Sequence, residues 1–170
     1  SGGGMDLLAA KYHNVKEIKG VEINPVIVRA IQNEFREYSG GIYSGGIEGI
    51  SVSVDEGRHF IESSEKKYDV IQLSGVATFS STHAGAFALS ENNLYSTEAF
   101  QSYFKRLNDN GFFTMTSWFS PDENGVPRFS VRLINIIRDS LDKLGMDPRN
   151  RVLFIVSDVY TVAVVKNGVF

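Results

Sequence analysis

Residues near the start of the chain have the types and the spacing of a nucleoside-binding site. A glycine-rich segment opens a predicted helix and consists of Gly2, Gly3, Gly4 and Asp6. Glycines allow a close approach of the backbone to a ligand, and a helix N-terminus offers free N–H groups. Glu22 follows about twenty residues later at the end of a predicted strand, where an acid can accept both ribose hydroxyls. Asp55 and Gly57 follow the next strand, where an acid typically receives the amino group of adenine.

Each of these groups also has a plainer interpretation. The glycines after Ser1 fit a linker, Glu22 fits a surface acid at a strand end, and Asp55 fits a helix cap, a role that can coexist with adenine binding. The three groups nevertheless stand beside consecutive predicted strands. Ligands of open α/β sheets bind at the carboxyl ends of the strands, so the coincidence favours a binding site.

Chemistry in open α/β folds of this kind usually takes place after the fourth strand. If a strand that would precede the glycine segment is counted as the first, the fourth strand of this chain ends at Ser74. His83 and Glu91 are candidate acid/base groups in the polar stretch that follows, although an exposed loop histidine is the plainer interpretation of His83. Glu91 and Tyr95 are candidates for contact with an acceptor substrate. Ser74 lacks the Gly-x-Ser-x-Gly context of a hydrolase nucleophile, and three widely spaced histidines form no metal motif, so we expect no metal.

Helix and strand signals alternate along the chain and would position these residues. The predicted helices are Met5–Tyr12, a segment from Pro25 to near Gly40, one after Asp55 through Ile61, Thr97–Leu107 and Phe129–Leu144. The predicted strands are Ile18–Ile23, Ile50–Val54, Tyr68–Leu73, Phe112–Trp118, Val152–Val156 and Tyr160–Val165. The repeated tetrad Ser-Gly-Gly-Ile around residues 39–47 predicts a flexible loop, and Asn110-Gly111 predicts a turn.

This alternation predicts an α/β fold with a three-layer, doubly wound, mostly parallel sheet that is Rossmann-like. The last two strands predict a C-terminal antiparallel hairpin, which places one antiparallel strand at the end of the sheet. Apart from a first strand, which would precede the glycine loop and is missing here, the order is that of the class I S-adenosylmethionine-dependent (methyltransferase) fold. We therefore expect residues 1–170 to form a single domain that is a fragment of a longer protein.

Composition narrows the classes further. The chain has 170 residues, 42% of them hydrophobic and 22% charged, which suits one globular domain. Its net charge of −3 excludes a strongly basic nucleic-acid surface, so no nucleic-acid partner is expected. The absence of cysteine excludes disulfides, thiolate catalysis and cysteine-bound zinc. No apolar run approaches the ~20 residues of a membrane-spanning helix, and we expect a cytoplasmic location.

Several motifs together resemble the catalytic domain of spermidine and spermine synthases, the polyamine aminopropyltransferases. They are Gly-Gly-Gly at 2–4, Val-Glu-Ile-Asn-Pro at 21–25, Val-Asp-Glu-Gly-Arg-His-Phe at 54–60, Lys-Tyr-Asp-Val-Ile at 67–71, Leu-Tyr-Ser-Thr-Glu-Ala-Phe at 94–100 and Leu-Asn-Asp-Asn-Gly-Phe-Phe at 107–113. The resemblance implies a transferase that binds S-adenosylmethionine, decarboxylated S-adenosylmethionine or methylthioadenosine. It also implies that Glu22 holds the ribose and that Asp55 and Gly57 hold the adenine, with Ser74 beside the cofactor.

The chain departs from this family where catalysis is expected. Aminopropyltransferases carry an acidic segment directly after the fourth strand, and Ser74 stands here at the position of its first Asp. A serine without a partner cannot deprotonate an amine at neutral pH. Two functions therefore stay open. One is aminopropyl or methyl transfer to a small-molecule amine or other acceptor. The other is a non-catalytic module that binds a nucleoside or a polyamine.

The chain most resembles the members of this family that are fused to membrane segments in large bacterial proteins. The resemblance therefore implies fused transmembrane segments in the parent protein, with this chain as its cytoplasmic domain. The missing strand would leave sheet edges exposed, so a homodimer is the further expected partner.

Overall fold

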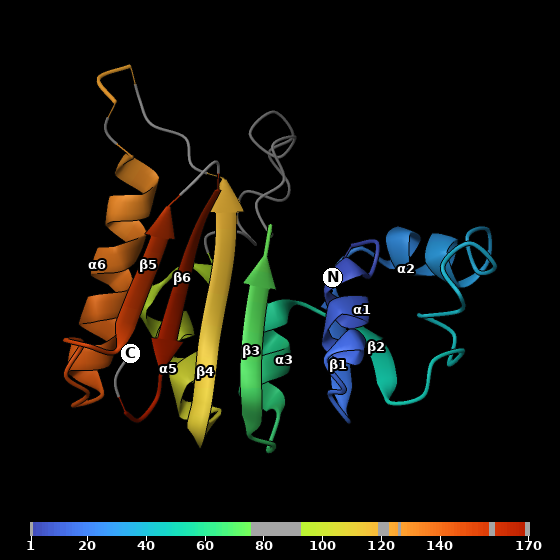
Figure 1. Ribbon diagram of the computed structural model, residues 1–170, viewed down its shortest axis with the longest axis horizontal. Coiled ribbons are helices and arrows are strands. Elements are labelled where there is room, and N and C mark those ends of the chain that lie inside the picture. Colours follow the sequence, from blue (N-terminus) through green and yellow to red (C-terminus); the bar gives the residue numbers. More distant parts are fainter. Residues whose placement is uncertain (1, 76–92, 119–122, 126, 157–158, 169–170) are drawn as a thin grey trace. The chain divides into compact units, whose positions relative to one another are not determined.

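The computed structural model describes residues 2–75, 93–118, 123–125, 127–156 and 159–168 (Figure 1). The chain divides into two compact units, Ser1–Phe60 and Ile61–Phe170. The predicted polar stretch Ser74–Asn93, with His83 and Glu91, lies mostly outside the described residues.

The first unit is built on a pair of parallel strands. Its elements in chain order are α1 (Met5–Tyr12), β1 (Ile18–Glu22), α2 (Pro25–Gln32), β2 (Ile50–Val54) and the first turn of α3 (Gly57–Ser63). The two strands pair in register from Ile18 opposite Ile50 to Glu22 opposite Val54. Their carboxyl ends therefore lie side by side, which brings the two predicted acid positions to one edge of this sheet.

Helix α2 begins as the sequence predicts and ends earlier. The side-chain oxygen of Asn24 accepts a hydrogen bond from the Val26 N–H at 2.9 Å, and Pro25 occupies the first helical position. The helix ends at Gln32 and not near Gly40, because the Phe35 N–H bonds to Ala30 O, five residues back, and interrupts the helical pattern.

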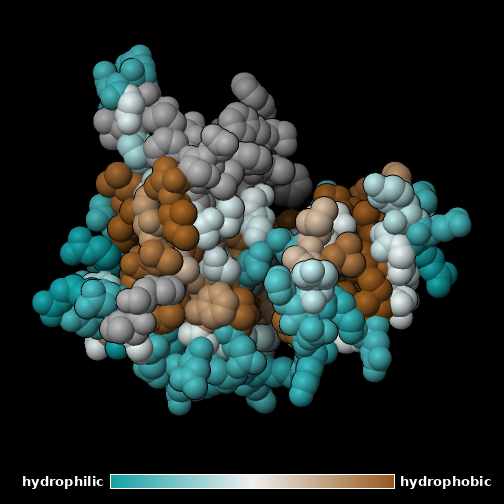
Figure 2. All heavy atoms as spheres, viewed as in Figure 1, coloured by the Kyte–Doolittle hydropathy of each residue, from teal (hydrophilic) through white to brown (hydrophobic). Residues whose placement is uncertain are grey.

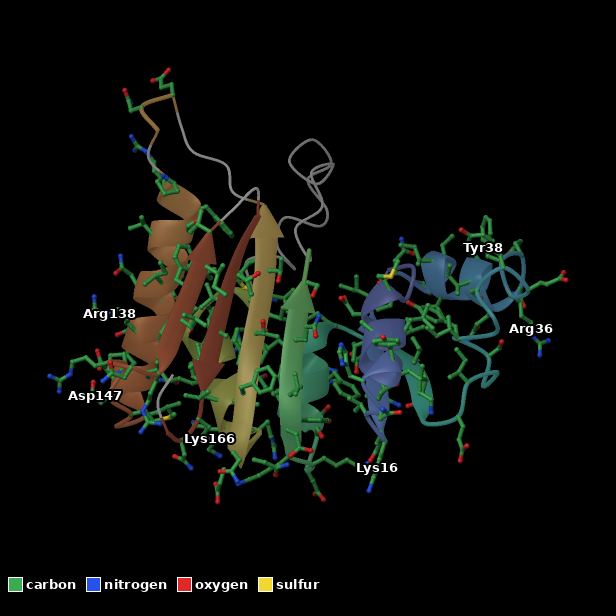
Figure 3. All side chains as sticks on the ribbon, in the orientation of Figure 1. Lys16, Arg36, Tyr38, Arg138, Asp147 and Lys166 are labelled. Carbon is green, nitrogen blue, oxygen red and sulfur yellow. The ribbon has the colours of Figure 1, made fainter. Side chains whose placement is uncertain are left out.

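The residues after Gln32 form a series of turns, and they change which side chains are buried. The four-residue spacing of Ile27, Ile31 and Phe35 predicts that Phe35 lies on the inward face of a longer helix, but its side chain is 53% exposed. Tyr38 and Arg36 point away from the unit (Figure 3). Residues 39–47 form turns, as the predicted loop requires, but Ile42 and Tyr43 within them are buried in the hydrophobic cluster of this unit. The other buried members are Leu7, Ile18, Val28 and Ile50.

The second unit contains a four-stranded sheet in the order β3-β4-β6-β5. The elements are β3 (Tyr68–Ser74), α5 (Thr97–Lys105), β4 (Leu107–Trp118), α6 (Arg128–Lys143), β5 (Val152–Val156) and β6 (Val159–Val165). Strands β3 and β4 are parallel, whereas β6 is antiparallel to both β4 and β5. The terminal hairpin is thus confirmed, but its antiparallel strand lies inside the sheet and β5 forms the edge.

An aromatic cluster forms the core of the second unit. Phe113 of β4 is fully buried and stacks on Tyr103 of α5, with ring centroids 5.6 Å apart and planes 3° apart. Phe100 and Phe104 meet the Phe113 ring edge to face at 5.4 and 5.8 Å. The four-residue spacing of Phe100 and Phe104 predicts that both side chains face inward from α5, and their burial confirms it.

Two strand predictions need correction. The turn predicted at Asn110-Gly111 lies inside β4 as an irregularity, because Tyr68 pairs with Leu107 and Val70 already pairs with Phe112. A Cβ on Gly111 would lie 2.9 Å from Tyr68 O, so only glycine fits there. The unbroken, mostly apolar run Tyr68–Leu73 predicts a strand that is buried on both faces, but the Val70 side chain is 42% exposed. In the described part of the chain, β3 pairs only with β4, which leaves it at the edge of its sheet.

The edge strand β5 leaves apolar side chains at the surface. Leu153, Ile155 and Val156 are between 39% and 55% exposed. Figure 2 shows the hydrophobic surface that gathers over this strand and the neighbouring part of α6.

Candidate nucleoside-binding site

The glycine segment forms a tight turn that leads into α1. Gly2 and Gly4 have φ angles of +46° and +88°, in the left-handed region that favours glycine. The carbonyl of Gly4 accepts the N–H groups of Leu7 and Leu8, both at 3.1 Å, and so starts the helix. A Cβ on Gly2 or Gly3 would have no heavy atom within 4 Å. The backbone of Gly2 and Gly3 is therefore open to the surroundings, which leaves room for a ligand to approach it closely.

Glu22, at the end of β1, reaches this turn with its side chain. One carboxylate oxygen accepts the Gly2 N–H at 2.8 Å, and the other accepts the Asn24 N–H at 3.1 Å. Burial alone would raise the pKa of this carboxyl, but the hydrogen bonds from the Asn24 and Gly2 N–H groups hold its pKa below the ordinary value. Glu22 is therefore ionised at neutral pH, which makes it a strong hydrogen-bond acceptor for hydroxyl groups.

Asp55 lies next to Glu22 because the strands β1 and β2 are parallel. Its backbone N–H donates to the Glu22 carbonyl at 3.1 Å. The helix-cap interpretation of Asp55 is wrong, since the carboxylate of Glu56 accepts the N–H groups of Arg58 and His59 at the start of α3. The Asp55 carboxylate instead meets the ring Nδ1 of His59 at 2.8 Å. Thus Glu56 holds the helix start, and Asp55 stays beside the strand ends.

The remaining predicted positions fall into three groups. Asp6 lies in the first turn of α1 and Gly57 opens α3, both within the first unit. Ser74 ends β3 in the second unit, where its hydroxyl accepts a hydrogen bond from the Gln72 amide at 2.8 Å. Tyr95 also belongs to the second unit, and its ring meets the edge of Phe129 at 5.9 Å. His83 and Glu91 lie outside the described residues.

The sequence does not predict the contribution of Tyr43 to the site. The buried Tyr43 donates its hydroxyl proton to the carbonyl of Gly2. Its neighbours in sequence are glycines and serines, which by themselves indicate a solvated loop. The only available signal was the placement of two apolar residues, Ile42 and Tyr43, between the two Ser-Gly-Gly runs.

Two further classes of feature are not found in the part of the chain that the structure describes. No group of three metal-ligating side chains is present among those residues. None of the helices described there is both long and apolar enough to span a bilayer.

Comparison with solved structures shows the fold. A spermidine synthase in complex with the transition state analogue AdoDATO matches with a TM-score of 0.60 at 16% identity, over 98% of this chain and 50% of that chain. The spermidine synthase from Thermotoga maritima gives 0.59 at 15% identity, over 98% and 50%. A protein from Streptococcus mutans described as a methyltransferase, in complex with SAH, gives 0.58 at 10% identity, over 96% and 83%. The chain has the Rossmann-like class I fold and spans about half the length of the two spermidine synthases.

Comparison of the sequence itself gives two results. Among curated proteins no match was found. The profile of the spermine/spermidine synthase domain, in contrast, matches residues 2–124, which is well over half of the chain. The matched span contains the glycine turn, Glu22, Asp55 and Ser74, and on this match the chain belongs to the spermine/spermidine synthase domain family of S-adenosylmethionine-related transferases.

Proposed function

We propose that the chain binds a nucleoside of the S-adenosylmethionine type and transfers an aminopropyl or methyl group from it to a small-molecule acceptor. The observation that carries the proposal is the ionised Glu22 carboxylate, which is hydrogen-bonded to the glycine turn at Gly2. Carboxylate acceptors beside a glycine turn at a helix N-terminus are the elements with which α/β folds recognise ribose.

The residues of the first unit fit such a ligand. Glu22 would accept the ribose hydroxyls, and the open backbone at Gly2 and Gly3 leaves room for the part of the ligand next to the sugar. Asp55 would accept the adenine amino group with Gly57 beside it, because β2 ends next to β1. The family match and the two similar structures that were solved with AdoDATO and SAH also support a nucleoside ligand of this type.

Group transfer also requires that the acceptor be positioned and deprotonated. A sulfonium donor makes the adjacent carbon electrophilic, so the remaining task of the protein is to orient the acceptor and take its proton. Ser74 ends β3 at the position where the family carries an acid, and its hydroxyl already accepts a hydrogen bond from Gln72. Among the sequence candidates, Glu91 and Tyr95, which lies two residues before α5, are those for acceptor contact, and His83 and Glu91 are the candidate proton acceptors.

A second function is favoured by Ser74 itself. A serine hydroxyl is too weak a base to deprotonate an amine without a partner. The alternative is therefore a non-catalytic module that binds the nucleoside or a polyamine and transmits its occupancy to the rest of the parent protein. Group transfer and nucleoside sensing require the same nucleoside site, so nucleoside binding must be measured first.

Calorimetric titration of the full chain with S-adenosylmethionine, decarboxylated S-adenosylmethionine and methylthioadenosine tests the proposal. At least one should bind, and Glu22→Gln should weaken it by about ten- to a hundredfold, because a charge-assisted hydrogen bond contributes about 1.5–3 kcal/mol. Glu34→Gln is the matched control, since Glu34 is an exposed glutamate of the same unit. Absence of binding by all three compounds, or equal affinity of wild type and Glu22→Gln, would contradict the proposed site.

A transfer assay then separates the two functions. The wild-type chain is incubated with decarboxylated S-adenosylmethionine and either putrescine or spermidine, and the aminopropylated product is quantified. Product formation supports the transferase. Binding without product on any tested amine, and without methyl transfer from S-adenosylmethionine, supports the non-catalytic module.

A further inference from the structure

Tyr43 connects a segment without regular structure to the glycine turn. It is 5% exposed and packs in the hydrophobic cluster of the first unit together with Ile42, which is 1% exposed. The main-chain oxygen of Tyr43 accepts a hydrogen bond from the Gln32 side chain at 3.0 Å. The ring is therefore fixed both by packing and by a hydrogen bond to α2.

The Tyr43 hydroxyl donates to the carbonyl of Gly2, which is 41 residues away in sequence. The N–H of the same residue donates to Glu22 at 2.8 Å. Gly2 is thus held on both sides of its α-carbon: the Tyr43 hydroxyl binds its carbonyl and the Glu22 carboxylate binds its N–H. A glycine has no side chain with which to fix itself, and its backbone is free to rotate, so such outside contacts decide its conformation.

The same segment touches the turn a second time. A Cβ on Gly4 would lie 3.1 Å from Ile42 Cδ1 and 3.4 Å from Tyr43 Cε1, so the backbone of Gly4 lies directly against these two side chains. The turn therefore rests on Ile42 and Tyr43 at one end and is tied to the Tyr43 hydroxyl at the other.

We propose that Tyr43 is a positioning residue of the nucleoside site. Its hydroxyl holds the Gly2 carbonyl so that the Gly2 N–H stays on Glu22, and this keeps the turn and the ribose acceptor in one fixed arrangement. This role rests on the proposed function, because it acts on the same site. The role of Tyr43 goes beyond that function, because it assigns part of the affinity for the nucleoside to a residue that makes no contact with the ligand.

The test is the variant Tyr43→Phe, which keeps the ring and removes only the hydroxyl. Affinity for the tightest-binding of the three nucleosides should fall by about five- to tenfold, the effect of one hydrogen bond of ordinary strength. Tyr103→Phe is the matched control, because Tyr103 is also buried and also donates to a main-chain carbonyl, that of Leu94, at 3.2 Å. It should lower the melting temperature and leave nucleoside affinity unchanged.

A second readout needs no ligand. If Tyr43 holds Gly2 against Glu22, then Tyr43→Phe weakens the Gly2 hydrogen bond and the pKa of Glu22, followed by NMR, rises toward its ordinary value. Gln32→Met removes the donor to the Tyr43 main chain at similar volume and should move both readouts in the same direction.

The outcomes separate this inference from the proposed function. If wild type binds no nucleoside, the proposed function fails, and the pKa of Glu22 still decides the positioning role. A raised pKa in Tyr43→Phe supports that role even then. An unchanged pKa of Glu22, or nucleoside affinity equal to that of wild type, overturns it.

Discussion

Replacement of Gly4 by alanine tests whether the glycine turn is a built structure or a linker. Gly4 has a φ of +88°, and an L-residue in the left-handed region costs about 1–2 kcal/mol. The added methyl would also lie 3.1 Å from Cδ1 of Ile42, which is 1% exposed and has little room to move. Overpacking of that kind costs about 1–3 kcal/mol. We therefore expect Gly4→Ala to destabilise the first unit by about 2–5 kcal/mol.

The assay should resolve the first unit from the second, because a chain with two units need not unfold in one step. Amide hydrogen exchange does so at Leu7 and Leu8, whose N–H groups both bond to Gly4 O. A loss of about 2 kcal/mol or more corresponds to a fall in protection of about thirtyfold or more. Gly3→Ala is the matched control, since a methyl there meets no heavy atom within 4 Å and φ lies outside the strained range.

Two results would refute this reasoning. Undiminished protection of Leu7 and Leu8 in Gly4→Ala would mean that the turn is not held against Ile42. Equal losses in Gly3→Ala and Gly4→Ala would mean that the effect belongs to glycine content and not to this position.

Three other variants test the site and the core. Phe113→Ala should destabilise the second unit by about 3–5 kcal/mol in denaturant unfolding, because removal of a fully buried ring that packs on Tyr103 leaves a cavity. A loss of stability under about 1 kcal/mol would contradict this packing. The lowered pKa of Glu22 stabilises the fold above the ordinary value of 4.5, and this contribution disappears as pH falls through the folded-state pKa. The stability difference between wild type and Glu22→Gln should therefore shrink on acidification from about pH 6 to about pH 3, whereas a constant difference would exclude an ionised Glu22 as its source. Ser74→Asp should increase aminopropyl transfer from decarboxylated S-adenosylmethionine if only the missing acid limits the reaction; no gain in transfer would place the limitation elsewhere.

The elements that local patterns determine were predictable. Helix α6 follows from apolar residues at helical spacing, and Leu133, Ile137 and Leu141 are buried as that spacing requires. The β5–β6 hairpin follows from two apolar runs with a short connection. These predictions succeed because a helix and a hairpin are both stabilised by contacts between residues that are close together in the sequence.

The errors arose where contacts distant in sequence decide the structure. The end of α2 and the burial of Tyr43 depend on each other, since the Gln32 side chain, at the last residue of the helix, bonds to the Tyr43 main chain. The irregularity at Gly111 depends on the close approach of Tyr68 O from another strand. A local pattern of Asn-Gly or Ser-Gly-Gly contains neither contact, so it indicated a turn in one case and a flexible loop in the other.

The candidate site was predictable for a geometric reason. Glu22 and Asp55 each follow a strand, and parallel pairing of those strands brings their backbones within a hydrogen bond of each other. The sequence could not tell which of the neighbouring acids Asp55 and Glu56 caps α3, because both precede the helix and both are carboxylates. The structure assigns the cap to Glu56, whose side chain is one methylene longer and reaches two backbone N–H groups of α3.

The distribution of these acids bears on how the two candidate functions are related. The acceptors proposed for ribose and adenine, Glu22 and Asp55, both belong to the unit Ser1–Phe60, and their geometry depends on β1, β2 and the glycine turn. Ser74 belongs to the other unit and ends a strand that pairs with β4. The hydrogen bonds from Gly2 and Asn24 that hold the Glu22 carboxylate therefore belong to a different unit from Ser74. A domain that has the proposed nucleoside acceptors without the proton acceptor would bind its ligand and transfer nothing, so a measured affinity identifies the ligand and only a transfer assay identifies an enzyme.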